Sequence, residues 1–503
     1  MKSALNRILI VLPLLLFAVT SCKDDDEQPI PQAISISPNA GLPGSTAIIQ
    51  GAQFSAEKSD NVVTFNGKIA SINQATAVQL DVVVPADAGT GPVAVVISVK
   101  GKVASSQLIY SVLPLNTTVT SIAPMKGGFN TLVTITGSNF DAVAVNNIVT
   151  FNGVQGTVQS ATATSLTVRV PAKAGTGAVV VNGSTPGPTF TYTPEIYVVG
   201  YEGQAGKYWK NGVAIPWSLP GKYVYFTGIA VVGNDVHVSG TEIKKNGSWV
   251  ATYWKNGVAV AMADSIRSTD VRAIEVVGND VYLTGNQTNP SFKFVATYWK
   301  NGSPVALTNG AYNAFTSDIT VVGSDVYAAG NHVTPTGYSA ASYWKNGTEV
   351  SLTQGTNRNG DAAGIAVVGN DVYVAGYETN ASAKSVAKYW KNGVENILTD
   401  GTRNAYGRGI MIVGSDVYVV GYETNMNGFG VAKYWKNSNE VVLTDGSHQA
   451  SAYSIEVIDD DVYVTGIERN GEGLDVSKYW KNGNPVVLSD AAVTTAALGI
   501  SVQ

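Results

Sequence analysis

Residues 364–400, GIAVVGNDVYVAGYETNASAKSVAKYWKNGVENILTD, contain the repeating unit that decides the fold of most of this chain. Two apolar runs, GIAVVG and DVYVAG, are followed by the KYWKNG segment and by a weaker run, ENILTD. Short runs rich in β-branched and aromatic residues, separated by Gly, Asn and Asp, are typical of strands joined by tight turns. The unit therefore predicts four antiparallel strands.

The unit recurs seven times. Its YWKNG segment, or a near variant, contains tryptophans spaced 45 residues apart, once 46: Trp209, Trp254, Trp299, Trp344, Trp390, Trp435 and Trp480. Four strands in about 45 residues are typical of a β-propeller blade, and apolar residues on both faces of the first two strands suit sheets covered by neighbours on each side. The Tyr-Trp pairs, from Tyr208-Trp209 to Tyr479-Trp480, are predicted to pack between blades.

The two ends of the array predict a closed ring. The first unit begins at Ile196, in its second strand, and lacks a first strand, whereas Leu498 to Val502 (LGISV) supplies one. An open solenoid would need polar caps, and none is visible. We therefore expect an all-β chain whose residues 195–503 form a seven-bladed β-propeller closed by the C-terminal strand, which leaves no exposed inner edge. The blades are similar to kelch and WD-type propellers in length only, so no propeller family is assigned.

A different repeat precedes this array. The first copy reads ISISPNAGLPGSTAIIQGAQF, NVVTFNG and VQLDVVVPADAGTGPVAVVISV, and the second reads TSIAPMKGGFNTLVTITGSNF, NIVTFNG and LTVRVPAKAGTGAVVV. Alternating apolar positions, Gly-rich turns and a length near 80 residues fit a small antiparallel sandwich. Two immunoglobulin-like modules are predicted, at 33–113 and 114–194.

Each module resembles an IPT/TIG domain almost from end to end. The resemblance lies in the Ser37-Pro38 and Ala123-Pro124 openings, in Gly51 and Gly137 before Phe54 and Phe140, and in Pro85 and Pro171 before AGTG. Such domains occur in transcription factors, receptors and bacterial surface proteins, so the resemblance does not imply one function. We expect the pair to act as a stalk; the alternative is that the modules bind ligand themselves.

The N-terminus indicates export. Lys2 and Arg7 precede an apolar run from Ile8 to Val19, which is too short to span a bilayer, and Cys22, the only cysteine, follows Thr20 and Ser21. Residues 1–21 are predicted to be a signal peptide whose end resembles a lipobox, so Cys22 would carry the lipid; the alternative is a chance cysteine. The acidic tether, 22–32, resembles the export tag of Bacteroidota surface lipoproteins or is an ordinary linker. We expect an outer-membrane lipoprotein that faces the cell exterior.

The long, unit-specific loops are the predicted binding surface. The first-to-second and third-to-fourth strand links repeat almost unchanged, whereas the second-to-third links and the connections between units differ, and variable loops on a fixed scaffold commonly bind ligands. Aromatic rings stack on sugars, and amides and guanidinium groups bond hydroxyls. The alternative is that these side chains only pack the loops. The candidate ligand-binding residues are Trp249, Phe292, Tyr312, Phe315, Tyr338, Arg358, Arg403, Tyr406, Phe429 and Tyr453.

Catalytic and metal signals are weak. The histidines, His237, His332 and His448, lie in separate units, and no GxSxG or HExxH occurs, so no catalytic residue, metal or cofactor is predicted. Asp459-Asp460-Asp461 is interpreted as a solvated turn, with calcium binding as the alternative. Five loop carboxylates could form a glycosidase pair: Glu202, Asp264, Glu378, Glu423 and Glu468.

The layout of lipid anchor, sandwich stalk and terminal ligand module resembles the surface glycan-binding lipoproteins of Bacteroidota. It implies a monomeric, non-catalytic protein that captures a polysaccharide or a surface protein. The net charge of −5, with no basic cluster, excludes an electrostatic footprint for nucleic acid. Two alternatives remain open: a glycoside hydrolase or polysaccharide lyase in the propeller mouth, and a structural or adhesive surface protein.

Overall fold

The computed structural model describes residues 30–113, 117–217, 223–260, 262, 268–355, 357–490 and 492–503. The predicted signal peptide, Cys22 and most of the acidic tether lie outside the described residues. The described part of the chain consists of strands and two short 3-10 turns, η1 (Lys58–Asp60) and η2 (Ala144–Asn146), as an all-β prediction requires. No helix in this part is long and apolar enough to span a membrane.

The two modules have the same pair of sheets, which are antiparallel except for one parallel strand pair in each module, β2 with β10 and β12 with β19. In the first, the sheets have the orders β1-β3-β7-β6 and β2-β10-β8-β4-β5, with β9 beside β8; in the second, the orders are β11-β13-β17-β16 and β12-β19-β18-β14-β15. The bounds are β1 (Gln32–Ser37), β2 (Ala40–Gly41), β3 (Thr46–Ala52), β4 (Asn61–Phe65), β5 (Lys68–Ile69), β6 (Ser71–Ala75), β7 (Gln79–Val83), β8 (Gly91–Val99), β9 (Lys102–Val103), β10 (Leu108–Val112), β11 (Thr118–Ala123), β12 (Lys126–Gly127), β13 (Leu132–Ser138), β14 (Val149–Phe151), β15 (Val154–Gln155), β16 (Thr157–Ala161), β17 (Ser165–Arg169), β18 (Gly177–Val181) and β19 (Thr189–Tyr192).

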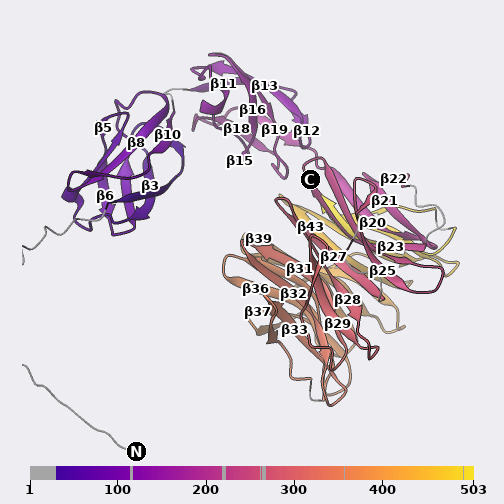
Figure 1. Ribbon diagram of the computed structural model, residues 1–503. Coiled ribbons are helices and arrows are strands. Elements are labelled where there is room, and N and C mark those ends of the chain that lie inside the picture. The colour runs from indigo at the N-terminus through magenta and orange to yellow at the C-terminus, as the bar shows by residue number, and fades with distance from the viewer. Residues whose placement is uncertain are drawn as a thin grey trace, which may run out of the picture. The chain divides into compact units, whose positions relative to one another are not determined.

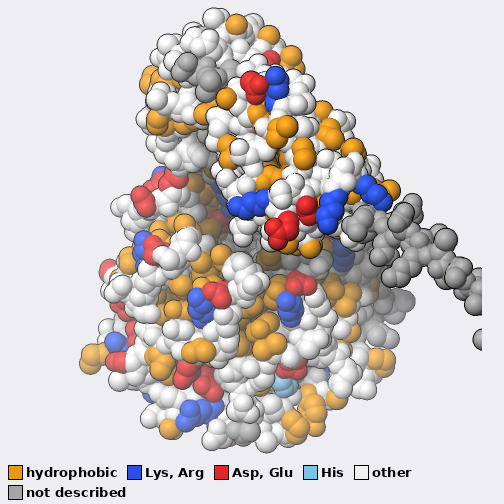
Figure 2. Space-filling view, turned by 90° about the vertical axis from the view of Figure 1, so that its left-hand side faces the viewer, with side chains coloured by type: hydrophobic (Ala, Val, Ile, Leu, Met, Phe, Trp, Pro, Cys, Tyr) orange, Lys and Arg blue, Asp and Glu red, His pale blue; other side chains and the backbone are white. Residues whose placement is uncertain are grey.

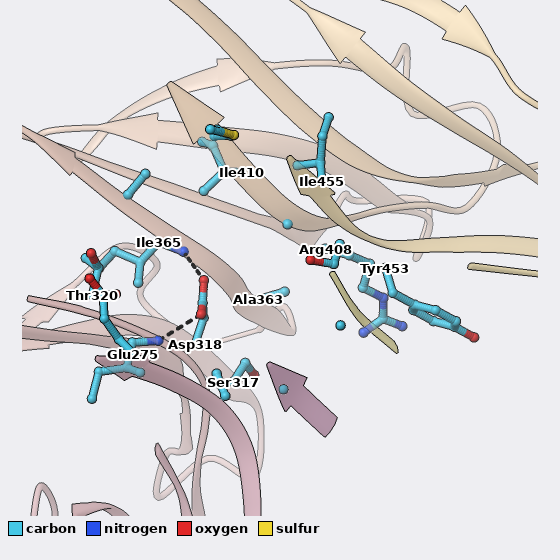
Figure 3. A pocket seen from close by; sticks show the side chains of 18 of the residues that line it. Glu275, Ser317, Asp318, Thr320, Ala363, Ile365, Arg408, Ile410, Tyr453 and Ile455 are labelled. Carbon is cyan, nitrogen blue, oxygen red and sulfur yellow. Dashed lines mark hydrogen bonds between the residues drawn. The ribbon is translucent and has the colours of Figure 1, made fainter. Parts of the chain in front are cut away.

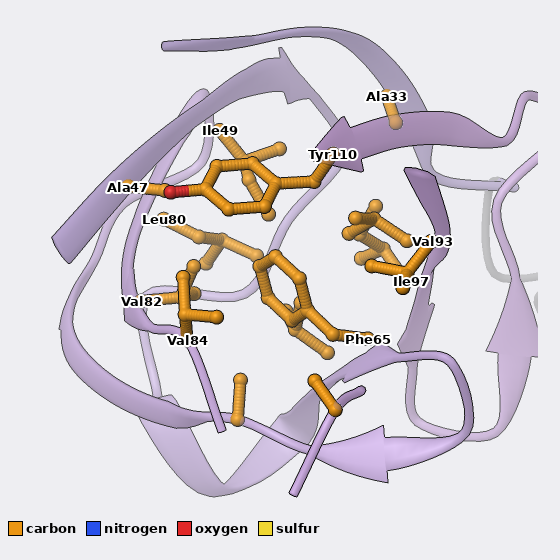
Figure 4. Packing of buried hydrophobic residues seen from close by; sticks show 14 of the residues in the cluster. Ala33, Ala47, Ile49, Phe65, Leu80, Val82, Val84, Val93, Ile97 and Tyr110 are labelled. Atoms are coloured by element: carbon orange, nitrogen blue, oxygen red, sulfur yellow. The ribbon is translucent and has the colours of Figure 1, made fainter. Parts of the chain in front are cut away.

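An aromatic pair occupies the centre of each module. In the first, the ring of Phe65 meets Tyr110 edge to face at 5.2 Å, among buried aliphatic side chains such as Ile49 (Figure 4). In the second, Phe151 and Phe190 take the same places, also at 5.2 Å. Alternate residues of each strand supply these side chains because successive side chains of a strand point to opposite faces.

Seven four-stranded sheets follow, one for each repeat. Six have their strands in chain order, and the first has the order β22-β21-β20-β47. The bounds are β20 (Ile196–Glu202), β21 (Ala205–Lys210), β22 (Val213–Ile215), β23 (Tyr223–Val232), β24 (Asp235–Ile243), β25 (Trp249–Lys255), β26 (Val258–Val260), β27 (Thr269–Val277), β28 (Asp280–Thr288), β29 (Phe294–Lys300), β30 (Ser303–Ala306), β31 (Ala314–Val322), β32 (Asp325–Val333), β33 (Ser339–Lys345), β34 (Thr348–Ser351), β35 (Gly360–Val368), β36 (Asp371–Thr379), β37 (Ser385–Lys391), β38 (Val394–Ile397), β39 (Ala405–Val413), β40 (Asp416–Thr424), β41 (Gly430–Lys436), β42 (Asn439–Val442), β43 (Ala450–Ile458), β44 (Asp461–Arg469), β45 (Asp475–Lys481), β46 (Asn484–Val487) and β47 (Thr495–Val502).

The first strands of these sheets contact one another in a cycle, β23, β27, β31, β35, β39, β43 and β47, and β47 in turn contacts β23. The C-terminal strand β47 pairs antiparallel with β20, so Val502 lies opposite Ile196, and the C-terminus lies beside β20 in Figure 1. The strand expected at Leu498 to Val502 begins three residues earlier, at Thr495. We call this assembly of seven sheets the ring.

The tryptophans of the repeats pack between neighbouring sheets, as their pairing with tyrosine suggested. Trp390, on β37, is 2% exposed and packs against Tyr327 and Tyr343 of the preceding sheet. Trp435, on β41, packs in the same way against Tyr373 and Tyr389. Large aromatic side chains at this interface account for much of the apolar area that each sheet buries against its neighbour.

The Lys and Asn of the YWKNG segment hold the hairpin end of each sheet. Lys391 Nζ lies 2.8 Å from Asp371 Oδ2, and the Asn392 side chain accepts a hydrogen bond from the backbone N–H of Val372. Asn392 and Gly393 have φ values of 51° and 80°, which suit the tight turn of a two-residue hairpin. On the face seen in Figure 2, Lys and Arg side chains lie beside Asp and Glu in small mixed groups. The repeated motif is therefore structural.

The Asp459-Asp460-Asp461 hairpin contacts the second module. The chain forms two compact units, and residues 118–138 and 149–503 belong to the same one. Within it, the Asp459 carboxylate accepts a hydrogen bond from the backbone N–H of Thr176 at 2.9 Å, and Asp461 pairs with Lys481 at 2.7 Å. The described residues contain no group of three or more potential metal-ligating side chains. Asp459 and Asp460 are exposed, so the hairpin remains interpreted as a solvated turn, to which the contact with Thr176 is added.

Candidate functional site

Each first strand of the ring carries a β-bulge at the same place, near the end where the variable loops lie. In β39, for example, the pairing with β40 shifts between Gly407 and Gly409, which leaves Arg408 as the extra residue. A bulge re-aims the side chain of its extra residue. These seven residues, which we call the bulge ring, all line one cavity of about 410 Å³, the channel; they are Thr227, Arg272, Ser317, Ala363, Arg408, Tyr453 and Leu498.

A ring of isoleucines follows the bulge ring. The residue two positions after each bulge residue is isoleucine in all seven strands, and each lines the channel; they are Ile229, Ile274, Ile319, Ile365, Ile410, Ile455 and Ile500. These side chains also pack between the sheets, where Ile365 for example is 4% exposed. The scaffold at this level is constant, whereas the bulge ring differs from strand to strand and so gives the channel its individual chemistry.

Carboxylates line the channel toward the end at which hairpins join the first and second strands of each sheet. Asp318, on β31, accepts hydrogen bonds from the backbone N–H groups of Ile319 and Ile365, both at 2.9 Å, and so ties β31 to β35 (Figure 3). Burial raises the pKa of Asp318 to about 6, although these two bonds oppose the shift. Burial, with the charge of Asp318 as a second cause, raises the pKa of Glu275 to about 7. Burial also raises the pKa of Glu456, which Lys173 of the second module approaches at 3.1 Å.

The raised pKa of Glu275 predicts that neutral pH destabilises the ring. The folded chain retains a proton that the unfolded chain releases near pH 4.5, so stability is lost as pH rises from about 4.5 through about 7. We expect the free energy of unfolding to fall by about 1 to 2 kcal/mol over that window, less than a fully buried group would give because the side chain faces the channel. Denaturant titrations at pH 5, 6, 7 and 8, followed by tryptophan fluorescence, measure this free energy of unfolding.

The matched variant for this prediction is Glu275→Gln, which cannot titrate. Its stability should exceed that of the unchanged chain at pH 8 and vary less with pH. Glu472→Gln, which removes an exposed carboxylate from a loop, serves as the control and should leave the slope unchanged. All nine tryptophans lie at residue 209 or beyond, so fluorescence reports on the ring. Equal slopes in all three chains would contradict the assignment.

Aromatic and cationic side chains surround the other end of the channel. The Arg408 guanidinium lies 5.8 Å and 5.9 Å from the ring centroids of Tyr406 and Tyr422, and Tyr377 meets Tyr406 edge to face. Figure 3 shows Arg408 pointing toward Tyr453, away from Asp318. Burial raises the pKa of Tyr453 to about 12, so its hydroxyl stays protonated at neutral pH.

A second cavity, of about 240 Å³, adjoins the channel. Its wall includes Tyr201, Tyr225 and Trp249, and it shares Thr227, Arg272 and Leu498 with the channel. The rings of Tyr201 and Tyr225 meet edge to face at 5.0 Å, and Trp249 is 47% exposed. We call it the aromatic pocket. An exposed indole beside two phenols and an arginine can bind a molecule that has both apolar and polar faces.

Two of the ten candidate binding residues line these two cavities, and a third contacts a member of the bulge ring. Trp249 lines the aromatic pocket, Tyr453 belongs to the bulge ring, and Tyr406 contacts Arg408. Phe315 instead packs on Phe294 at 5.1 Å, and Arg403 approaches Glu423 at 3.8 Å. The other five are exposed and line neither cavity: Phe292, Tyr312, Tyr338, Arg358 and Phe429.

The sequence-based selection missed Arg272, Tyr201 and Tyr225. These residues lie in strands, whereas the search was confined to loops. A signal was present: when the seven units are aligned, the residue two positions before the constant isoleucine changes in chemistry from unit to unit, from Arg to Leu. Without the bulge, however, that position would not have been expected to face the channel.

The carboxylates considered as a glycosidase pair are held by lysines. Glu378 lies 3.1 Å from Lys388, Glu423 lies 2.9 Å from Lys433, and Glu468 forms the equivalent pair with Lys478. Asp264 lies outside the described residues, and Glu202 pairs with Lys207. Because the same pair recurs in three sheets, it belongs to the repeat and supplies no separated acid and base.

Two segments, 31–112 and 117–193, match the IPT/TIG domain family, so the chain contains two IPT/TIG domains. No curated protein matches the chain. Among solved structures, a protein of unknown function from Bacteroides thetaiotaomicron has 10% identity over 91% of this chain and 99% of that one, with a TM-score of 0.31. An auxiliary nutrient binding protein from the same organism has 12% identity over 73% and 99%, with a TM-score of 0.29. A surface glycan-binding protein from Prevotella bryantii has 18% identity over 32% and 42%, with a TM-score of 0.17.

Proposed function

We propose that this chain is a non-catalytic surface lipoprotein that captures a glycan through the variable-loop face of its ring. In this proposal residues 195–503 are a seven-bladed β-propeller closed by the C-terminal strand, and the modules at 33–113 and 114–194 form the stalk. Cys22 carries the lipid, and the protein is a monomer on the outer membrane, facing the exterior. The cyclic contacts of the seven first strands support the propeller assignment.

The aromatic pocket is the observation that carries the proposed function. Sugar rings present an apolar face that stacks on aromatic rings, while their hydroxyls need polar partners. The pocket offers the exposed Trp249 and two tyrosines beside Arg272. It also opens beside the polar bulge ring, so a chain of several sugars could contact both cavities. Capture of a protein partner is the alternative ligand class, and binding tests distinguish the two.

Replacing Trp249 is expected to weaken glycan binding. Loss of one stacked ring should lower the affinity about ten-fold in Trp249→Ala, which corresponds to about 1.4 kcal/mol, and Trp249→Phe should retain part of it. The measurement is a glycan array and affinity gels on the chain without its first 22 residues, with chromatography of any products. Phe292→Ala is the control, because Phe292 is 87% exposed on a loop and lines neither cavity.

The outcomes of that experiment distinguish glycan capture from catalysis and from binding of a protein partner. Retention without cleavage, weakened only in the Trp249 variants, supports the proposal. Released products would favour the hydrolase or lyase alternative. Failure of every glycan to bind would overturn the carbohydrate proposal and leave a protein partner or an adhesive role.

A further inference from the structure

We propose that the bulge ring binds an anionic group on the captured glycan, a sugar carboxylate or a sulfate ester, with Arg408 as its principal ligand and Arg272 as a second one. This inference rests on the proposed function, since it names the class of glycan that the same face would take. It assigns to the channel mouth a charge preference that stacking of sugars on aromatic rings alone would not give.

Arg408 is a cation without an internal counter-ion. Among the described residues, no carboxylate lies within 4.0 Å of its guanidinium nitrogens, whereas Arg272 pairs with Asp270 at 2.8 Å and Arg469 with Asp475 at 2.9 Å. Its Nε is buried and has no hydrogen-bond partner. Leaving a buried donor of a charged group unsatisfied is costly, so the arrangement favours an acceptor that comes from outside the chain.

The surroundings of Arg408 hold its side chain ready for a planar anion. Tyr406 and Tyr422 lie against the guanidinium, with their ring centroids 5.8 Å and 5.9 Å from its central carbon. Stacking on aromatic rings fixes the plane of the guanidinium and leaves its edge to pair with carboxylate or sulfate oxygens. Tyr453, the next member of the bulge ring, keeps its hydroxyl proton at neutral pH and can donate to the same anion.

Space and charge around the bulge ring also favour an anion there. On the other side of Arg408, the bulge residues Ala363 and Ser317 are small, so they leave the channel open (Figure 3). Arg272 lies three sheets away from Arg408 in a ring of seven, nearly opposite across the mouth. Deeper in the channel, Asp318 and Glu275 would repel an anion. The position of lowest energy for a negative group is therefore the bulge ring.

The test compares matched acidic and neutral polymers. Binding of the chain without its first 22 residues is measured by affinity gels and calorimetry with polygalacturonate, with its fully methyl-esterified form, with dextran sulfate and with dextran. We expect polygalacturonate or dextran sulfate to bind at least ten-fold more tightly than its neutral counterpart. The acidic polymer that binds identifies the source of the anion as carboxylate or sulfate ester.

Arginine variants decide whether the bulge ring is responsible. Arg408→Met should lose the preference for the acidic polymer, about ten-fold or more, and Arg408→Lys should keep part of it because lysine retains the charge but not the planar fork. Arg272→Met, at a side chain that is half exposed, should fold in any case and lower the affinity several-fold. Arg403→Met is the control, since Arg403 lies on a loop outside both cavities.

The two proposals fail in different ways. Binding of neutral polymers that depends on Trp249, without any preference for acidic ones, would overturn the anion site and leave the glycan proposal in place. Acidic preference that survives in both Arg408→Met and Arg272→Met would also overturn it. Failure of both acidic polymers, and of free galacturonate and inorganic sulfate added up to millimolar concentration, would overturn the anion site, whereas the glycan proposal falls only if every glycan on the array also fails to bind.

Discussion

Removal of residues 495–503 should abolish the folded ring and leave an aggregating chain. These residues contain β47, which pairs with β20 along its whole length and contacts the first strands β43 and β23. Without β47, the inner edge of β20 would be unpaired, and the cluster that includes Trp209 and Ile500 would be opened to water. An exposed apolar strand edge is a template for pairing with other chains.

Size-exclusion chromatography and thermal melting by tryptophan fluorescence measure this effect. A second variant, Ile500→Asp, keeps the chain length but places a charge at a side chain that is 5% exposed, and it should lower the melting temperature by roughly 10 °C or more. Val487→Asp, at an exposed position on the outer strand β46, is the control and should melt like the unchanged chain. A truncated chain that stays monomeric and melts cooperatively would show that the ring does not depend on its last strand.

Replacing Trp390 by alanine should destabilise the ring by about 3 to 5 kcal/mol. The indole is 2% exposed and fills the space between the β35 sheet and Tyr327 and Tyr343 of the preceding one, so its loss leaves a large cavity as well as lost contact area. Trp390→Phe refills part of that space and should lose less. Denaturant titrations followed by the remaining eight tryptophans measure the change.

Trp249→Ala is the matched control for Trp390→Ala. Both variants remove one indole from a third strand of the ring, but Trp249 is 47% exposed and should change stability by under about 1 kcal/mol. The pair thus separates the two uses of tryptophan in this chain, packing between sheets and contact with ligand. Equal losses in both variants would show that Trp249 is structural, which would weaken its assignment to the binding site.

Local features of the repeat were predictable from single units. The hairpins follow from Asn392 and Gly393, because these residue types adopt positive φ at little cost, and the partners they need lie within about 21 residues along the chain. The packing role of Trp390 followed in the same way, because a large apolar residue in the same place of every unit has to be buried in every unit.

The candidate site was predictable only in part. Trp249 and Tyr453 were chosen for their chemistry and lie at the two cavities, but Phe292 and Tyr312 were chosen on the same grounds and lie exposed. Composition cannot separate these cases, since which of these residues face a cavity depends on neighbouring sheets. Asp459 is a similar case, because its partner Thr176 is 283 residues away in the chain.

The sequence by itself determined the repeat lengths, the four strands per unit, the two earlier modules and the place of the last strand, because periodic apolar patterns and turn residues act over short distances. The tertiary structure alone decided which side chains face the channel. Arg408 reaches the channel because the pairing of β39 with β40 slips by one residue, and it lacks a counter-ion because of what the neighbouring sheets place around it. Register and charge environment depend on contacts between distant segments, which no local pattern records.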